Sequence, residues 1–448
     1  METATATAPI PASAPIPGPS APAVVQTAQW LAGPIEFLER CRERYGEAFR
    51  VHFLAAGEMV VISDPDALKQ LFGQDRTNRM PKGRTVLLEP VMGPRSILLQ
   101  EDEEHLRRRR LMLPPFHGER MKAYEGLIAE IAAAEVAGWS EGEQLELHPR
   151  MQAITLEVIM RAVFGVTDQE RLAELRQLLP QLLTMVESGR SQVIGLTTRR
   201  LGKLGPWRVF QRVVDRIDAL IAAEVAARRS DPDLGEREDI LSLLVAARDE
   251  DGEGMGDDEL RDQLMTLLVA GHETTATALA WTFDLLFRHP PVMERLTGEL
   301  ATNGAEYLDA VIEESLRLRP VVPFTGRELA APATLDGLAL EQGTVVMASI
   351  YLAHTRGDVY PEPHEFRPER FLDGNVETYS WIPFGGGMRR CLGASFALME
   401  MQVVLRTILT TVALRGTRSE AEPVVRRNIT FSPKHGTPAL VERRLAVS

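Results

Sequence analysis

Residues 381–400 of this 448-residue chain read WIPFGGGMRRCLGASFALME and include Cys391, one of only two cysteines. Three glycines, Gly385 to Gly387, precede the cysteine; glycine suits positions with positive φ or a close approach by another group. Gly393 follows, and the apolar run after it predicts a helix that begins near the sulfur. A helix N-terminus and two neighbouring arginines favour thiolate over thiol. Such a cysteine is a nucleophile, a metal ligand or an inert core residue.

Composition limits the class of protein. The formal net charge of −13 argues against general nucleic-acid binding, and the 44% apolar content allows a sizeable core. Two cysteines cannot build a disulfide framework, so we expect a reducing, cytoplasmic location. Because there is no apolar run of about 18 residues, no transmembrane anchor is expected. Residues 1–27, rich in Pro and Ala, predict a disordered lead-in to a single domain over 28–448.

Helical periodicity dominates the chain, which predicts a mainly α fold with minor β structure. Residues 28–46 predict a first amphipathic helix. Residues 259–287 predict the longest helix, roughly 40 Å long and central in the fold. The middle of that helix, residues 270–275 (AGHETT), contains poor helix formers, which suggests a functional purpose.

The residues around Cys391 narrow its chemistry. A zinc site is disfavoured because no second cysteine and no histidine near Cys391 in the sequence supply further ligands. A thiol nucleophile would need a histidine partner, and the nearest in sequence, His364, has no motif around it. The remaining use is a single axial thiolate to a metal that a cofactor carries.

The run FGGGMRRCLG resembles the heme-binding signature of the cytochrome P-450 superfamily, and its matching positions are Phe384, Gly387, Arg389, Cys391 and Gly393. The resemblance implies that these residues bind heme b (iron protoporphyrin IX), with Cys391 as the axial ligand of the iron. It also implies the family's fold, a helix-rich triangular prism with small β-sheets. The resemblance covers roughly residues 28–445.

Three further motifs resemble the same family. Glu314 and Arg317 share one face of a predicted helix, and Arg370 lies in a later Pro-Glu-Arg-Phe segment. The resemblance implies a buried cluster of these three residues that braces the loop presenting Cys391. The alternative is an exposed helix pair that contributes a few tenths of a kcal/mol.

The second motif is His105-Leu106 followed by four arginines. His105 and Arg109 lie one helical turn apart, and family members use this pair to bind heme propionates. Arg327 and Arg389 match two further propionate partners. The other arginines are expected to face outward, and a basic surface for an acidic electron donor is expected at Arg107, Arg110 and Arg390.

The third motif, residues 270–275, is similar to the family's oxygen-activation motif. Glu273 and Thr274 would then be catalytic. The threonine hydroxyl would hold a water or donate a proton, and the acid would connect the site to bulk protons. The alternative for Thr274 is a hydrogen bond back to a carbonyl within its own helix.

The resemblance implies a monooxygenase that inserts one atom of O2 into an apolar small molecule, by hydroxylation or epoxidation of a terpenoid, steroid or fatty acid. Electrons would come from a separate partner, such as a ferredoxin with its reductase, since no flavin or iron–sulfur module is expected. The basic stretch 190–212 is either a solvated connector or a lid that touches an anionic substrate or a membrane. The expected pocket residues are Leu87, Leu88, Met92, Thr266, Val269, Ala270, Val322, Phe324 and Phe431.

Three other functions remain open. A heme-thiolate peroxygenase, isomerase or dehydratase would share the fold, although Glu273 and Thr274 argue against it. A heme-based sensor or binding protein would need a further signalling module. A cysteine hydrolase without heme would be colourless.

Overall fold

The computed structural model describes residues 15–54, 56–81, 89–118, 120–165, 168–187, 206–372, 374, 376–427 and 429–445. The chain forms two compact units. The first comprises Met1–Gly83, Phe324–Pro361 and Glu377–Arg390, and the second comprises Arg84–Pro323, Glu362–Val376 and Cys391–Ser448. One boundary between the units therefore falls at the peptide bond before Cys391.

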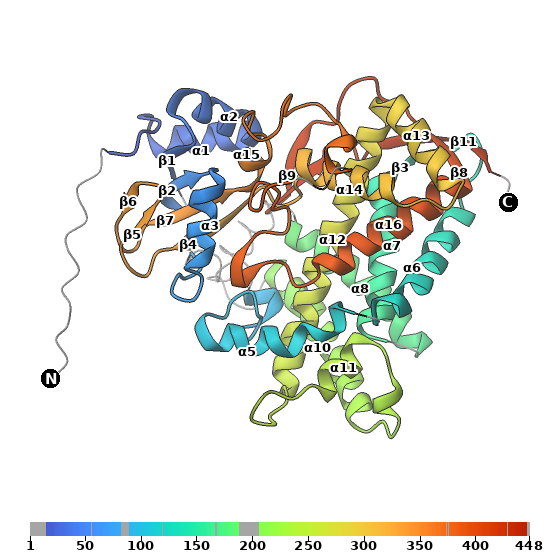
Figure 1. Cartoon of the computed structure of the whole chain (residues 1–448). Helices are drawn as coiled ribbons and strands as arrows, with labels where there is room; N and C mark the ends of the chain where they lie inside the picture. The colour runs from blue at the N-terminus through green and yellow to red at the C-terminus, as the bar shows by residue number, and fades with distance from the viewer. Residues whose placement is uncertain are drawn as a thin grey trace. The chain divides into compact units, whose positions relative to one another are not determined.

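The first unit is built on a four-stranded sheet, whose spatial order is β1 (Ala48–Phe53), β2 (Gly57–Ile62), β7 (Val345–Ser349) and β4 (Phe324–Glu328) (Figure 1). Strand β2 pairs antiparallel with β1 and parallel with β7, and β4 returns antiparallel to β7. A separate hairpin joins β5 (Ala333–Leu335) to β6 (Leu338–Leu340). Its turn residues Asp336 and Gly337 both have positive φ, 44° and 78°, as a two-residue hairpin turn requires.

Short helices surround this sheet, namely α1 (Ala23–Ala32), α2 (Pro34–Tyr45), α3 (Pro65–Gly73), α15 (Ile350–His354) and the 3-10 turn η5 (Gly387–Arg389). Helix α3 begins where Asp64 accepts hydrogen bonds from the N–H groups of Asp66 and Ala67, with Pro65 in the first turn. Its apolar face, including Leu68 and Phe72, joins Val346 of β7 and Ile382 in one buried cluster.

The predicted lead-in ends earlier than expected. Residues 15–27 are not disordered: the carbonyl of Pro17 accepts the N–H of Arg50 in β1 at 2.8 Å, and Gln26 is 2% exposed. Composition alone could not reveal that this segment bonds to β1 or that Gln26 is buried. Residues 1–14 lie outside the described part. The predicted helix at 28–46 is also two helices, α1 and α2, because the chain breaks at Gly33 before Pro34.

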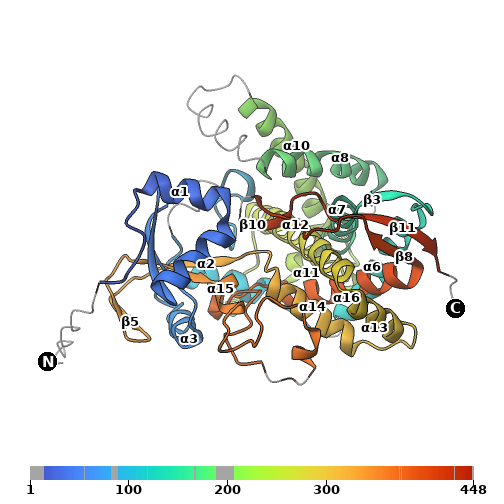
Figure 2. The same cartoon turned by 90° about the horizontal axis from the view of Figure 1, so that it is seen from above.

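The second unit is mainly helical, and its elements are α5 (Asp102–Met112), η1 (Pro114–Phe116), α6 (Arg120–Ala137), α7 (Leu147–Val158), the π-helical turn η2 (Ile159–Val163), α8 (Gln169–Glu187), α10 (Pro206–Arg229), η3 (Leu234–Glu236), α11 (Ile240–Ala246), α12 (Asp257–Arg288), α13 (Pro290–Leu300), α14 (Glu306–Leu318), η4 (Pro368–Phe371) and α16 (Ala394–Thr411). Helix α12 has 32 residues, is the longest described helix and packs against α7, α10, α14 and α16. The predicted long central helix is therefore confirmed. Helices α8 and α10 lie side by side (Figure 2).

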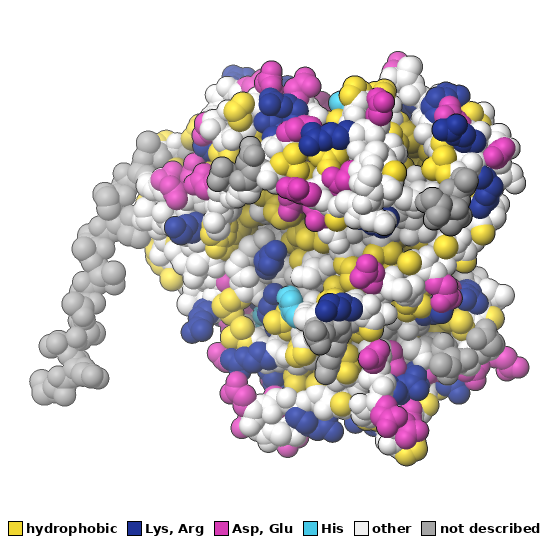
Figure 3. Space-filling view, turned by 45° about the vertical axis from the view of Figure 1, so that its right-hand side comes forward, with side chains coloured by type: hydrophobic (Ala, Val, Ile, Leu, Met, Phe, Trp, Pro, Cys, Tyr) yellow, Lys and Arg dark blue, Asp and Glu magenta, His cyan; other side chains and the backbone are white. Residues whose placement is uncertain are grey.

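Small sheets complete the second unit. One has the order β3 (Gln144–Glu146), β11 (Pro438–Arg444) and β8 (Val412–Gly416), and the other pairs β9 (Val424–Arg427) with β10 (Thr430–Pro433). The predicted class, mainly α with minor β, is confirmed. No helix in the described part is long and apolar enough to cross a membrane. On the face drawn in Figure 3, basic and acidic side chains are interspersed rather than gathered by sign.

Candidate functional site

Cys391 lies between the turn η5 and the start of α16. Helix α16 begins at Ala394 with Gly393 as its N-cap residue, so the predicted helix near the sulfur is present. Cys391 is exposed, whereas Cys41 is buried. Burial raises the pKa of the Cys41 thiol to about 11, which makes that residue inert. Cys391 is thus the cysteine that is placed to react or to bind a metal.

The glycines before Cys391 are required by close neighbours in the first unit. A Cβ on Gly386 would lie 2.5 Å from the ring of Phe72. A Cβ on Gly387 would lie 2.2 Å from Oδ2 of Asp75, and its φ is +66°. Both contacts come from the C-terminal end of α3 and the turn after it. The sequence predicted a close approach at these glycines but did not identify Phe72 or Asp75.

Arg327 on β4 is fully buried and pairs with Asp75. Its Nε donates to Oδ1 of Asp75 at 2.6 Å and one terminal nitrogen donates to Oδ2 at 3.1 Å. The other terminal nitrogen donates to the Thr325 hydroxyl and the Gly326 carbonyl. The expected pairing of Arg327 with a heme propionate stays a prediction, because its carboxylate partner within the chain is Asp75.

The cluster of Glu314, Arg317 and Arg370 is present in the second unit. The Arg317 guanidinium donates to both oxygens of Glu314, at 2.6 and 2.8 Å, and both side chains are 0% exposed. Nε of Arg370 lies 3.4 Å from Glu314 Oε1. Burial, chiefly, lowers the pKa of Arg370. The exposed-pair alternative is therefore wrong.

The cluster holds a different segment from the one expected. Arg317 donates to the carbonyls of Pro363 and Glu365, and Arg370 donates to that of Glu362. The N–H of Arg367 donates to Glu314. These bonds fix residues 362–371, whereas bracing of the loop that presents Cys391 stays a prediction.

His105 and Arg109 lie one turn apart on α5, as the spacing predicts, and His105 is buried. The prediction that the other arginines of α5 face outward is wrong for Arg108, which is 6% exposed and pairs with Glu104 and Glu259. Arg107 and Arg110 are also engaged, because both pair with acidic residues of the 249–259 segment. The hydrogen bond that Arg107 donates to Asp249, above all, raises the pKa of Arg107. The chain itself thus supplies the acids that this surface was expected to receive from a partner.

The middle of α12 has one face that the described residues leave partly uncovered. Ala270 is exposed, and Val269 and Thr274 are half-buried, within a helix whose other residues are mostly buried. The Thr274 hydroxyl donates to the Ala270 carbonyl at 2.6 Å. Thr266 and Thr282 make the same bond to residues four positions earlier, at 2.6 and 3.0 Å. Back-bonding is therefore common to this helix, and partial exposure distinguishes Thr274.

Glu273 points to α7. Gln152 donates to its Oε2 at 2.5 Å, and Nε2 of His148 lies 3.3 Å from its Oε1. The Thr277 hydroxyl donates to Oε1 at 3.2 Å. Burial alone would raise the pKa of Glu273, but the hydrogen bond and charge of His148 and the bond from Gln152 outweigh it and lower that pKa. His148 and Gln152 were not expected as partners of Glu273, although their i, i+4 spacing within α7 was a usable signal.

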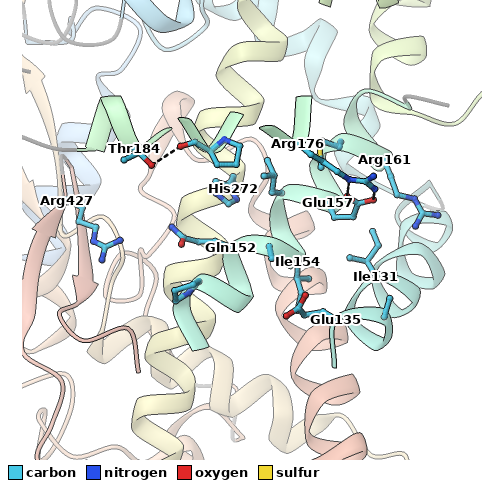
Figure 4. Close-up of a pocket in the computed structure, with 16 residues that line it drawn as sticks. Ile131, Glu135, Gln152, Ile154, Glu157, Arg161, Arg176, Thr184, His272 and Arg427 are labelled. Atoms are coloured by element: carbon cyan, nitrogen blue, oxygen red, sulfur yellow. Dashed lines mark hydrogen bonds and ion pairs between the residues drawn. The ribbon is translucent and has the colours of Figure 1, made fainter. Parts of the chain in front are cut away.

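A pocket of about 850 Å³ opens beside this network (Figure 4). Gln152 of α7 and His272 of α12 lie in its central wall, between Arg427 on one side and the Arg176–Glu157 pair on the other. Nδ1 of His272 lies 3.0 Å from the Thr155 hydroxyl. Burial lowers the pKa of His272 to about 4, so this imidazole is neutral. Gln152 therefore separates the pocket from the carboxylate of Glu273.

The predicted substrate residues fall into separate groups. Met92 and Thr266 are both buried around Ser96, whose hydroxyl lies 2.7 Å from that of Thr266. Phe431 is buried, and its N–H donates to the carbonyl of Val321, the residue next to Val322. Phe324 belongs to the first unit, where it packs on Trp30. Leu87 and Leu88 lie outside the described residues, as does most of the basic 190–212 stretch.

Known proteins resemble this chain over almost all of its length. The cytochrome P450 family model matches residues 15–435. The provisionally named cytochrome P-450 135B1 of Mycobacterium tuberculosis is 42% identical over 96% of this chain and 92% of its own, and cytochrome P-450 137 of the same species is 39% identical over 93% and 87%.

Solved structures agree with the fold. Cyanobacterial CYP120A1 with retinoic acid bound has a TM-score of 0.81 at 24% identity, covering 97% of this chain and 100% of that one. A variant of the cytochrome P-450DA heme domain has a TM-score of 0.83 at 24% identity, covering 97% and 98%. This chain belongs to the cytochrome P-450 family, whose members bind heme b and are generally heme-thiolate monooxygenases.

The residues present fit heme b. The described residues contain no group of three His, Cys, Asp or Glu side chains that could hold a metal ion. Cys391 supplies a single thiolate, which is what the axial position of heme iron takes. The uncovered face at Ala270 and Thr274 is small and nearly apolar, which suits a flat apolar group. The cofactor of this chain is heme b.

Proposed function

We propose that this protein is a monooxygenase that inserts one atom of O2 into an apolar small molecule, by hydroxylation or epoxidation of a terpenoid, steroid or fatty acid. The observation that carries the proposal is the centre of α12, where the uncovered face at Ala270 lies beside Thr274 and the buried acid Glu273. Heme b, when bound through a thiolate, supplies the chemistry of O2 reduction and O–O cleavage.

The chain's own residues supply ligation and protons. Cys391 provides the axial thiolate, which Arg389, Arg390 and the start of α16 favour. Thr274 holds a water or passes a proton at its hydroxyl, once that hydroxyl turns from the Ala270 carbonyl. Glu273, whose pKa is lowered, takes up a proton in transit and passes it on to replenish Thr274. Gln152, which donates to Glu273, also lines the pocket of Figure 4.

Cationic side chains are assigned to the heme carboxylates, and apolar side chains to the substrate. We propose that His105, Arg109, Arg327 and Arg389 face the heme carboxylates, and that Phe384, Gly387 and Gly393 shape the loop around Cys391. Substrate contacts are assigned to Val269, Ala270 and Val322 with their neighbours, which favour an apolar substrate. Electrons come from a separate donor in the cytoplasm, such as a ferredoxin with its reductase.

An absorption spectrum tests the proposal directly. The reduced protein with carbon monoxide should show the Soret band of a thiolate-ligated heme, and Cys391→Ala should abolish it. Cys41→Ala is the matched control and should leave the band unchanged, because Cys41 is buried in the first unit. A histidine-type spectrum, or a band that survives in Cys391→Ala, contradicts the assignment. Turnover with O2 and electrons, but not with peroxide alone, separates a monooxygenase from a peroxygenase.

A further inference from the structure

Asp75, the buried partner of Arg327, belongs to none of the motifs that resemble the family. Their side chains are 0% and 1% exposed, and they are 252 positions apart in sequence. Burying two charges removes both from water, so such a pair is stable only with good geometry and further hydrogen bonds. Arg327 meets both conditions through its two bonds to Asp75 and through Thr325 and Gly326.

The glycine turn lies directly against this pair. The guanidinium of Arg327 is 5.3 Å from the centre of the Phe72 ring and makes a long contact, 3.5 Å, with the Gly386 carbonyl. No side chain fits at Gly387, because a Cβ there would overlap the Asp75 carboxylate at 2.2 Å. The backbone of the turn therefore cannot shift toward α3.

The turn is also held on either side of these glycines. The N–H of Ile382 donates to Nε2 of His354 at 2.8 Å, and the N–H of Gly385 donates to the Ile382 carbonyl at 2.9 Å. The N–H of Arg390 donates to the Gly387 carbonyl at 3.2 Å. Backbone bonds thus define the shape of the turn, and among the described residues Phe72 and Asp75 lie nearest to Gly386 and Gly387.

We propose that Asp75 is a positioning residue for the heme ligand. Asp75 fixes Arg327, the pair fixes Gly386 and Gly387, and the chain then presents Cys391, four residues further on, in one conformation. This inference rests on the proposed role of Cys391 as the axial ligand. Outer residues that orient metal ligands typically change metal affinity or activity about 10- to 100-fold when mutated, so the effect is measurable.

The first test is Asp75→Asn in the heme-loaded protein. Asparagine keeps the shape but removes the charge that Arg327 pairs with. We expect the thiolate-type Soret band with carbon monoxide to shrink in favour of the band of heme that has lost its thiolate. We also expect hydrogen exchange at the amides of Gly385 and Arg390 to speed up about tenfold, which corresponds to ~1.4 kcal/mol.

Asp358→Asn is the matched control. Asp358 also pairs through both oxygens with an arginine of the first unit, Arg356, at 3.0 and 2.6 Å. Its loss should lower stability slightly and leave both the Soret band and the exchange of the turn amides unchanged. An equal loss of the thiolate band in Asp358→Asn overturns the inference.

A double variant separates positioning from the cost of a lone buried charge. Asp75→Leu with Arg327→Met removes both charges, which often restores or improves stability. The inference expects this variant to fold and still to show a reduced thiolate band per heme bound, a ratio that corrects for any heme lost with Arg327; full recovery of that ratio overturns it. A wild-type spectrum in Asp75→Asn also overturns it. If the unmodified chain shows no thiolate band, the proposed function itself is wrong, so the two failures are distinguishable.

Discussion

The side chain of Gln263 on α12 accepts the backbone N–H of Ile97 at 2.9 Å and donates to the carbonyl of Arg95 at 2.7 Å. One glutamine thus satisfies two backbone groups of an irregular segment, as a neighbouring strand would. Asp262 adds a bond to the N–H of Arg95 at 2.8 Å. Residues 95–97, which follow the expected pocket residue Met92, are therefore fixed on the central helix.

Gln263→Ala should release this segment. Gln263 is 0% exposed, and its loss leaves the Arg95 carbonyl and the Ile97 N–H without partners, each at about 1–3 kcal/mol. We expect faster hydrogen exchange at Ile97 and a lower free energy of unfolding. If the segment shapes the substrate pocket, KM should rise more than kcat falls. The control is Gln100→Ala, which removes a bond on the exposed side of the segment; an equal effect there contradicts the role of Gln263.

Thr274→Val should uncouple oxygen reduction from product formation. Valine keeps the shape and removes the hydroxyl that we assign to proton transfer. Heme content should stay unchanged, and released hydrogen peroxide should increase severalfold per electron consumed, measured with a surrogate ferredoxin and reductase. Thr282→Val removes the same type of back-bond from a fully buried site on α12 and should leave coupling unchanged. Unchanged coupling in Thr274→Val removes this residue from its proposed role.

Glu400 on α16 should make stability fall as pH rises. Burial raises its pKa from 4.5 to about 8, against a hydrogen bond from Thr275 that lowers it. Between these values the folded protein keeps a proton that the unfolded chain has released, so unfolding becomes easier by at most about 1.4 kcal/mol per pH unit. Glu400→Gln has no proton to lose and should remove this slope, as chemical unfolding from about pH 5 to about pH 8 would show. A slope that persists in the variant assigns it to another group.

His272 should make stability fall as pH falls, which is opposite to the effect of Glu400. Its pKa falls from 6.5 to about 4 on folding, chiefly through burial, so the unfolded chain binds a proton that the native state excludes. Stability is then lost as pH falls through this window. His272→Asn should flatten the acid side of the profile, whereas His52→Asn, at an exposed site, should not. Because the effects of Glu400 and His272 oppose each other where their windows overlap, the unmodified protein should show a shallow profile that only the single variants resolve.

Local patterns in the sequence predicted much of the fold and of the site. The periodicity of residues 259–287 gave the central helix, and the spacing of Glu314 and Arg317 gave a pair that proved to be buried. The glycines before Cys391 predicted a close approach. These features depend on neighbours within a few turns, where side-chain types and spacing carry the signal.

Contacts between distant segments could not be predicted in this way. Asp75 pairs with Arg327, and Gln152 bonds Glu273, only when separate elements pack, and neither Asp75 nor Gln152 differs in its local sequence from a solvated residue. The same limit explains the error at α5, where Arg108 looked like part of a solvated run but is buried against Glu259. The ordering of residues 15–27 likewise depends on a distant contact, in which the Pro17 carbonyl accepts the N–H of Arg50 in β1.

The buried carboxyl of Glu400 also has a calorimetric consequence. At neutral pH the unfolded chain carries this group as an anion, and the native state carries it as the acid, so folding takes up roughly one proton from the buffer at this position. The buffer must release that proton, and buffers differ in their heat of ionisation. The measured enthalpy of folding should therefore change with the choice of buffer at a fixed pH, and Glu400→Gln should remove the part of that dependence that corresponds to this proton.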